Sequence, residues 1–118
     1  MVVDDSMMMR DIIKKAFNKL GKPVNFLEAE DGERAYSILE ENQVALIIMN
    51  WNMPKLNGID VLKKVRASEA YKDIPVVMLT SEAAKSNLDE AMKAGATAYL
   101  TKPIKEDIFM ETFSKIDF

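Results

Sequence analysis

The chain has 118 residues, 48% of them hydrophobic and 30% charged, a balance typical of a globular protein that buries a core of its own. A formal net charge of −3 gives no electrostatic reason to expect nucleic-acid binding, and no apolar run approaches the ~18 residues of a membrane span. The chain has no cysteine and no histidine, which excludes disulfides, thiolate zinc sites and Ser-His-Asp or Cys-His catalysis. Carboxylates, amides, hydroxyls and lysines remain for chemistry, and the lack of cysteine fits a cytoplasmic protein.

Apolar runs alternate with helical stretches along the whole chain, which predicts an α/β fold with a parallel sheet. After a first strand ending at Val3, Ser6 is a suitable helix cap, and Gly21 is expected to stop that first helix. The pattern contains no repeat and no linker, so we expect one domain over residues 1–118. The other expected strands are residues 24–29, 44–49, 75–80 and 98–101, and the other expected helices begin near Asp31, Gly58, Ala84 and Lys105.

The first strand is unusually short. Only Met1, Val2 and Val3 precede the acidic pair, whereas strands commonly have ~5–6 residues. Either the natural start lies a few residues upstream or the strand is clipped here. A central parallel strand is normally buried on both faces, and this favours an upstream start.

Polar side chains follow four of the expected strands, at the point where each strand ends. Asp4 and Asp5 follow the first strand, Asn50 follows the third, Thr80 ends the fourth and Lys102 follows the fifth. The carboxyl ends of parallel strands meet at one edge of a sheet, where ligands of such folds bind. We therefore expect these groups to gather there, in a pattern suited to holding a divalent cation beside a phosphoryl group.

Four blocks of sequence resemble the receiver domains of two-component response regulators, and the match spans the whole chain. Within that family the chain is most similar to single-domain chemotaxis regulators of the CheY type, because its Trp-Asn-Met-Pro segment and Tyr99 sit as they do in that subgroup. The resemblance implies a doubly wound, flavodoxin-like sheet of five parallel strands in the order 2-1-3-4-5, with helices on both faces. The four blocks are Val3-Asp4-Asp5-Ser6, Asn50-Trp51-Asn52-Met53-Pro54 with Asn57-Gly58, Leu79-Thr80-Ser81, and Lys102-Pro103.

The resemblance also implies a role for each of these residues. In the family, a sensor histidine kinase or a small acyl phosphate transfers a phosphoryl group to an aspartate at the position of Asn50. Mg²⁺ would be held by Asp5 directly, by Asp4 largely through water, by residue 50 and by the backbone carbonyl of Asn52. Lys102, before a cis proline bond, would place its charge on the phosphoryl oxygens. The Thr80 hydroxyl would bond the phosphoryl group, and the Tyr99 ring would follow it inward as a switch, staying outward without phosphate.

Asn50 is the one serious departure from the family pattern. Its amide keeps one oxygen for Mg²⁺ but loses a negative charge and the ability to form an acyl phosphate. We therefore expect metal affinity to fall and stability to rise, because repulsion among three acids is relieved. The substitution is either an engineered block or a natural feature of a receiver that works without phosphate. With Asn50 present, Lys102 is free to pair with Asp5 instead.

Each of these residues also has a structural interpretation. Asp4 or Asp5 fits a helix cap, and Asn50 suits a strand end. Lys102 fits a solvated surface residue, as most lysines in proteins are. Tyr99 fits a half-buried strand position with a wet hydroxyl, and Trp51 is expected to be exposed beside the site. The functional interpretation is favoured where several of these residues occur together.

We expect a stand-alone, cytoplasmic, monomeric signalling protein that is not an enzyme and binds neither nucleic acid nor membranes. Its native form would take a phosphoryl group from a sensor histidine kinase and signal to the flagellar motor switch or another protein. The binding face would be formed by the fourth helix, the fifth strand and the fifth helix, with Lys85, Lys93, Tyr99 and Lys105. One alternative is a phosphate-independent pseudo-receiver. A Mg²⁺-dependent phosphatase is a weaker one, because its chemistry would need an aspartate at position 50.

Overall fold

The computed structural model describes residues 1–81 and 85–118, with the side chains in those ranges except those of Lys85 and Ser86. Five strands pair in parallel in the order β2-β1-β3-β4-β5, which confirms the flavodoxin-like order that the resemblance implies. The strands are β1 (Val2–Val3), β2 (Glu28–Ala29), β3 (Ile47–Asn50), β4 (Val76–Thr80) and β5 (Ala98–Thr101).

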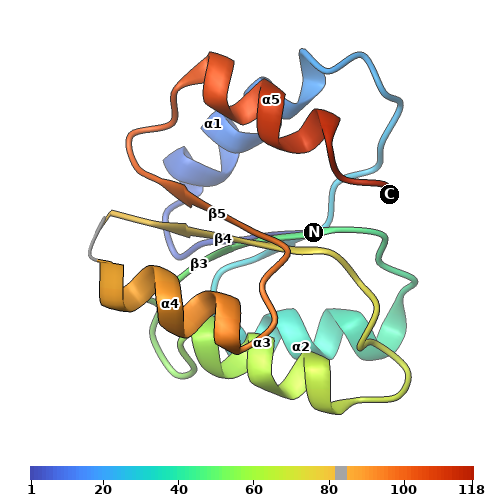
Figure 1. The fold of residues 1–118 in the computed structure, drawn as a ribbon. Coiled ribbons are helices and arrows are strands. Elements are labelled where there is room, and N and C mark those ends of the chain that lie inside the picture. Colours follow the sequence, from blue (N-terminus) through green and yellow to red (C-terminus); the bar gives the residue numbers. More distant parts are fainter. Residues whose placement is uncertain (82–84) are drawn as a thin grey trace.

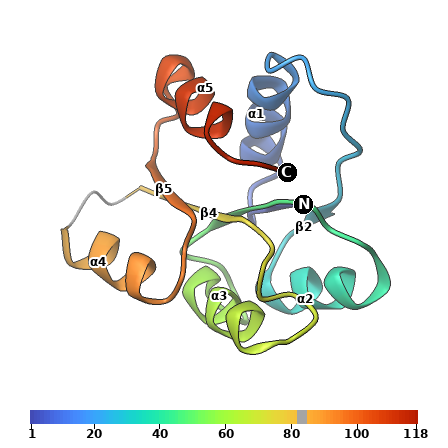
Figure 2. The same ribbon diagram turned by 45° about the vertical axis from the view of Figure 1, so that its right-hand side comes forward.

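Helices cover both faces of this sheet. Figures 1 and 2 show α1 and α5 side by side on one face, and α2, α3 and α4 on the other. The helices are α1 (Met7–Asn18), α2 (Gly32–Glu41), α3 (Gly58–Ala67), α4 (Lys85–Lys93) and α5 (Glu106–Ser114). The start near Ala84 that the sequence suggested for α4 lies outside the described residues.

The core has two layers, one on each side of the sheet. Val3 and Met49 face the layer beneath α2 and α3, whereas the preceding residues Val2 and Ile48 face the layer beneath α1 and α5. Successive strand residues point to opposite faces, so the central strands must be apolar along their whole length. Every residue of β3 and β4 is accordingly buried, which fixes the polar residues at their ends in place.

Two helices next to the site begin with side-chain caps. The Ser6 hydroxyl accepts a hydrogen bond from the backbone N–H of Met9 at 3.2 Å, as the sequence predicts for the start of α1. Asp31 does the same for α2, with its carboxylate 2.8 Å from the N–H of Arg34. These caps fix where the chain turns from strand into helix beside the carboxyl ends of β1 and β2.

Two predicted strands are shorter than expected. The run 24–29 forms a strand only at Glu28–Ala29, and the run 44–49 is strand only from Ile47. The reason is a missing partner, because both runs flank β1, which has only two residues. The prediction for residues 98–101 is confirmed at both ends.

None of the helices in the described part of the chain combines the length and apolar character needed to cross a membrane.

Candidate functional site

The carboxyl ends of the strands bring the predicted polar residues together. Among the described residues, four polar or charged side chains are buried, and three of these, Asp4, Asn50 and Thr80, lie at this edge. They come from β3, from β4 and from the residue that follows β1. Burying polar groups is costly unless they are hydrogen-bonded or paired with an opposite charge. We therefore expect each of these three side chains to have such partners nearby.

Lys102 links two of these buried groups. Its ammonium Nζ donates to Asp4 Oδ2 at 3.2 Å and to Asn50 Oδ1 at 3.1 Å. The other oxygen of Asp4 accepts the backbone N–H of Ser6 at 2.9 Å. The Lys102-Pro103 peptide bond is cis, as the resemblance implies. The predicted alternative in which Lys102 pairs with Asp5 is wrong, because the buried Asp4 carboxylate is the acid that needs a counter-charge.

The Asn50 amide is oriented by its surroundings. Its Nδ2 donates to the backbone carbonyl of Asn52 at 2.7 Å and lies 3.5 Å from Asp5 Oδ1, while its oxygen faces the Lys102 ammonium. The amide nitrogen, a donor, thus faces acceptors, and the amide oxygen, an acceptor, faces a donor. The reverse orientation would set the amide N–H groups against the ammonium and its oxygen against other oxygens.

The oxygens around Asn50 are those expected for a Mg²⁺ site. Carboxylates and a backbone carbonyl are hard ligands, and Asp5, which is exposed, is open to a hydrated ion. The described residues nevertheless hold no group of three or more acidic, histidine or cysteine side chains suited to a metal ion. The donor set therefore fits Mg²⁺ in kind, but the Asn50 N–H groups compete with an ion for the Asn52 carbonyl and Asp5.

Thr80 and Tyr99 lie on the adjoining strands β4 and β5. Thr80 is buried, and its carbonyl accepts the backbone N–H of Lys102 at 2.7 Å, which joins the ends of the two strands. Tyr99 is half-buried on β5, in register with Met78, and packs against the core layer that also contains residues of α2 and α3. The roles predicted for these two side chains as switch residues stay predictions.

Trp51 and Gly58 shape the loop after β3. Trp51 is half-buried and packs against the core, so the expectation that it is exposed is wrong. The N–H of Gly58 donates to the Trp51 carbonyl at 2.8 Å, and a Cβ at Gly58 would collide with the backbone oxygen of Asn50. The loop can pass this close to the site only because residue 58 is glycine.

Arg10 supports the site although it was not singled out from the sequence. Its guanidinium donates to the backbone carbonyl of Asp4 at 2.7 Å and to Glu28 at 3.0 Å. Hydrogen bonds from Lys14 and then from Arg10 hold the pKa of Glu28 below its usual range. A basic residue one turn into the helix after the acidic pair, with an acid on the neighbouring strand, is the signal that would have identified it.

Known proteins with related sequences share this fold. The response regulator receiver domain family matches residues 1–114. A chemotaxis protein CheY homolog of Campylobacter jejuni is 41% identical over 117 residues, covering 98% of this chain and 89% of the relative. Chemotaxis protein CheY1 of Helicobacter pylori is 43% identical over 112 residues, covering 94% and 90% of the two chains.

A solved structure of a chemotaxis protein has the same fold as this chain. The Vibrio cholerae chemotaxis protein CheY4 superimposes with a TM-score of 0.85 at 30% identity, covering 98% of this chain and 95% of the other. Sequence and structure comparisons therefore agree with the topology described above. The chain belongs to the receiver domain family of two-component response regulators, and its relatives at about 40% identity are CheY chemotaxis proteins.

Proposed function

We propose that this chain is a CheY-like single-domain response regulator, spanning residues 1–118, whose phosphoacceptor position is occupied by Asn50. The observation that carries the proposal is the contact between Asn50 Oδ1 and the Lys102 ammonium, 3.1 Å apart, beside the buried Asp4. Asn50 is buried at the end of β3, with the Lys102 ammonium and the acids Asp4 and Asp5 around it. Its amide, however, is not a nucleophile. As it stands, the chain does not accept a phosphoryl group, because a neutral amide oxygen is a poor nucleophile.

The native reaction of this site would need a carboxylate at position 50. One carboxylate oxygen attacks the phosphorus of the donor, the bond from phosphorus to the donor atom breaks, and the donor leaves with the electron pair. Lys102 provides a positive charge for the phosphoryl oxygens, and the Thr80 hydroxyl lies on the adjoining strand to bond one of them. Mg²⁺, held by Asp4, Asp5, residue 50 and the Asn52 carbonyl, would neutralise charge between the acids and the phosphoryl group.

The proposed partners follow from the same assignment. A sensor histidine kinase would be the phosphoryl donor, and the face of α4, β5 and α5 would bind the flagellar motor switch or another signalling protein. On that face Leu88, Met92 and Ile108 are exposed apolar residues, and Lys93 and Lys105 are exposed lysines. Exposed apolar side chains rimmed by charges are typical of protein-binding surfaces. The side chain of Lys85, expected on this face, lies outside the described residues. We propose a monomer without catalytic turnover of its own that resides in the cytoplasm.

A second candidate is a phosphate-independent pseudo-receiver that binds its partner in one fixed state. One observation favours it: in the described part of the chain, no buried side-chain nitrogen or oxygen lacks a hydrogen-bond partner. The polar edge is thus complete without an ion or a phosphoryl group. A phosphatase remains disfavoured, because its chemistry also needs an aspartate at position 50.

Intact-mass spectrometry after incubation with acetyl phosphate and MgCl₂ separates these functions. The experiment compares the protein with Asn50→Asp and with a matched control, Asn52→Asp. The control adds an acid two residues away at an exposed position whose backbone carbonyl is unchanged. We expect only Asn50→Asp to gain the mass of a phosphoryl group and to lose it again when the acetyl phosphate is removed.

Two other outcomes would change the assignment. If no variant gains mass, the pseudo-receiver is the better description. If the unsubstituted protein gains a phosphoryl group, Asn50 does not occupy the phosphoacceptor position and the proposal is wrong.

A further inference from the structure

The loop after β3 is built around a strained residue. Lys55 has a backbone φ of 67°, in the left-handed region that residues with a Cβ rarely adopt. The carbonyl of Pro54 accepts the backbone N–H of Leu56 at 2.8 Å, so Lys55 is the central residue of a three-residue γ-turn. With a positive φ at its centre, this turn is of the classic type, which is rare and strained.

Hydrogen bonds within the loop, residues 51–58, enclose this turn. The Met53 N–H donates to the Asn57 side-chain oxygen at 3.3 Å, and the Gly58 N–H donates to the Trp51 carbonyl at 2.8 Å. The strained turn therefore lies at the centre of a closed loop. A change in the conformation of the turn would be passed on to the residues on both sides of it.

A buried acid outside the loop holds Lys55 in place. Asp31, at the start of α2, has a side chain that is 8% exposed, and its Oδ2 lies 3.6 Å from the Lys55 ammonium. Its other oxygen accepts the Arg34 N–H at the cap of α2, which fixes the carboxylate from one side. A buried carboxylate favours a nearby counter-charge strongly. Asp31 therefore draws the Lys55 side chain towards α2, and the attraction offsets the strain of the Lys55 backbone.

The start of α2 and the loop are also in direct contact. A Cβ at Gly32 would collide with the backbone oxygen and the Cβ of Leu56. The residue after Asp31 and the residue after Lys55 thus pack with no side chain on residue 32 between them. The ion pair and this contact join the two segments at adjacent positions, so the loop is anchored to α2 at its strained turn.

The Asn52 carbonyl lies three residues before Lys55 in the same loop. It accepts a hydrogen bond from Asn50 Nδ2 at 2.7 Å. A backbone carbonyl has no side-chain torsions with which to adjust, so the conformation of the loop alone places it. The position of this oxygen beside residue 50 therefore depends on how firmly the loop is held.

We propose that Lys55 and Asp31 are positioning residues for the Asn52 carbonyl. Their ion pair holds the strained turn, and the turn sets the place of that carbonyl beside residue 50. Strained backbone persists where the surroundings impose it, and it is concentrated at functional sites. The role of the carbonyl as a Mg²⁺ ligand rests on the proposed function, whereas its contact with the Asn50 amide does not.

Hydrogen exchange followed by NMR tests the inference without a metal. Asp31→Asn removes the negative charge but retains a residue that caps helices equally well, and Lys55→Gln removes the positive charge. We expect each substitution to speed exchange of the Leu56 and Gly58 amides and of the Asn50 side-chain N–H groups about fivefold. Lys55→Arg keeps the ion pair and should exchange like the parent protein.

Three controls separate positioning of the loop from general stability. Lys63→Gln removes an exposed lysine of α3 and should leave these exchange rates unchanged. The Arg34 amide, which reports on the α2 cap, should exchange at the parent rate in Asp31→Asn. Lys55→Gly removes the strain, because glycine adopts a positive φ without steric cost. In that background Asp31→Asn should have no further effect, since the ion pair has no strained turn left to hold.

Mg²⁺ affinity gives a second readout, in the Asn50→Asp background. Adding Lys55→Gln or Asp31→Asn should weaken Mg²⁺ binding about threefold, because the Asn52 carbonyl is then less firmly placed, and Lys55→Arg should not. Absence of Mg²⁺ binding to Asn50→Asp itself would contradict the proposed function, and the exchange rates would still decide the inference.

Two results would overturn the inference. One is unchanged exchange of the Leu56, Gly58 and Asn50 groups in both Asp31→Asn and Lys55→Gln. The other is an equal effect of Asp31→Asn with lysine and with glycine at position 55. That result would show that Asp31 acts on the start of α2 and not on the turn.

Discussion

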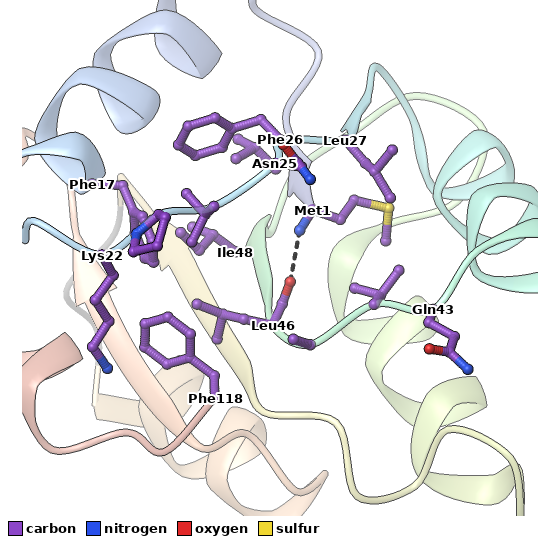
Figure 3. Close-up of a pocket in the computed structure, with 15 residues that line it drawn as sticks. Met1, Phe17, Lys22, Asn25, Phe26, Leu27, Gln43, Leu46, Ile48 and Phe118 are labelled. Atoms are coloured by element: carbon purple, nitrogen blue, oxygen red, sulfur yellow. Dashed lines mark hydrogen bonds between the residues drawn. The ribbon is translucent and has the colours of Figure 1, made fainter.

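At the carboxyl ends of the strands, Lys102 donates hydrogen bonds to both Asp4 and Asn50, and every buried side-chain nitrogen or oxygen among the described residues has a partner. At the amino ends, by contrast, a cavity of about 490 Å³ with a mainly apolar lining lies between residues 24–27 and 43–46 (Figure 3). Both edges end the same five strands. Polar side chains that pair with one another therefore close one end of this parallel sheet, whereas mainly apolar side chains line the other end.

Loss of a charge at the carboxyl edge is therefore expected to lower the stability of the protein strongly. Lys102→Met leaves the buried Asp4 carboxylate without its counter-ion and should lower the free energy of unfolding by about 3 kcal/mol. Urea denaturation measures this change. Lys105→Met, which removes an exposed lysine three residues along, is the matched control and should change stability little. Equal effects of the two substitutions would contradict the role given to the Lys102–Asp4 pair.

At the amino edge, the contribution to stability should instead depend on pH. The Met1 amine has a pKa of about 6 when folded, against 8.0 for the unperturbed group, because burial disfavours its charged form. Between these values the unfolded chain binds more protons than the folded one, so stability rises with pH from 6 to 8, by about 2 kcal/mol. The chain has no histidine to titrate in this window. Urea denaturation at pH 6, 7 and 8 measures the rise, and acetylation of the N-terminus should abolish it. A rise that survives acetylation would have another origin.

The mouth of the cavity is held by a weaker contact. Lys22→Ala removes the ammonium above the Phe118 ring and should lower the free energy of unfolding by about 0.5 kcal/mol. Lys22→Arg keeps a cation at that place and should retain the stability of the parent protein in thermal denaturation. A loss of equal size in both variants would show that packing of the lysine stem, and not its charge, closes the mouth.

The α/β class and the gathering of the polar residues were predicted well because both follow from local patterns, whereas the strand order was implied only by the resemblance to receiver domains. Alternating strands and helices determine the class of fold, and the polar residue after each apolar run marks its carboxyl end. Strand lengths were predicted less well. Residues 24–27 have the composition of a strand, but a strand also needs a neighbour to pair with. The neighbouring strand β1 begins only at Val2.

Pairings inside the site also depended on details that sequence does not carry. Asp4 and Asp5 are adjacent and chemically alike, yet Asp4 is buried and Asp5 exposed. Burial decides that Lys102 pairs with Asp4, and burial is a property of the folded chain. Arg10 was missed for the same reason, since its contact with the Asp4 carbonyl depends on where α1 begins.

The decisive measurement is the Mg²⁺ affinity of the protein and of Asn50→Asp, by titration calorimetry at one ionic strength. In the protein as it stands, the Asn50 N–H groups compete with an ion for the Asn52 carbonyl and Asp5. We therefore expect Asn50→Asp to bind Mg²⁺ at least about tenfold more tightly than the parent protein. Equal affinities would show that residue 50 does not control the ion site.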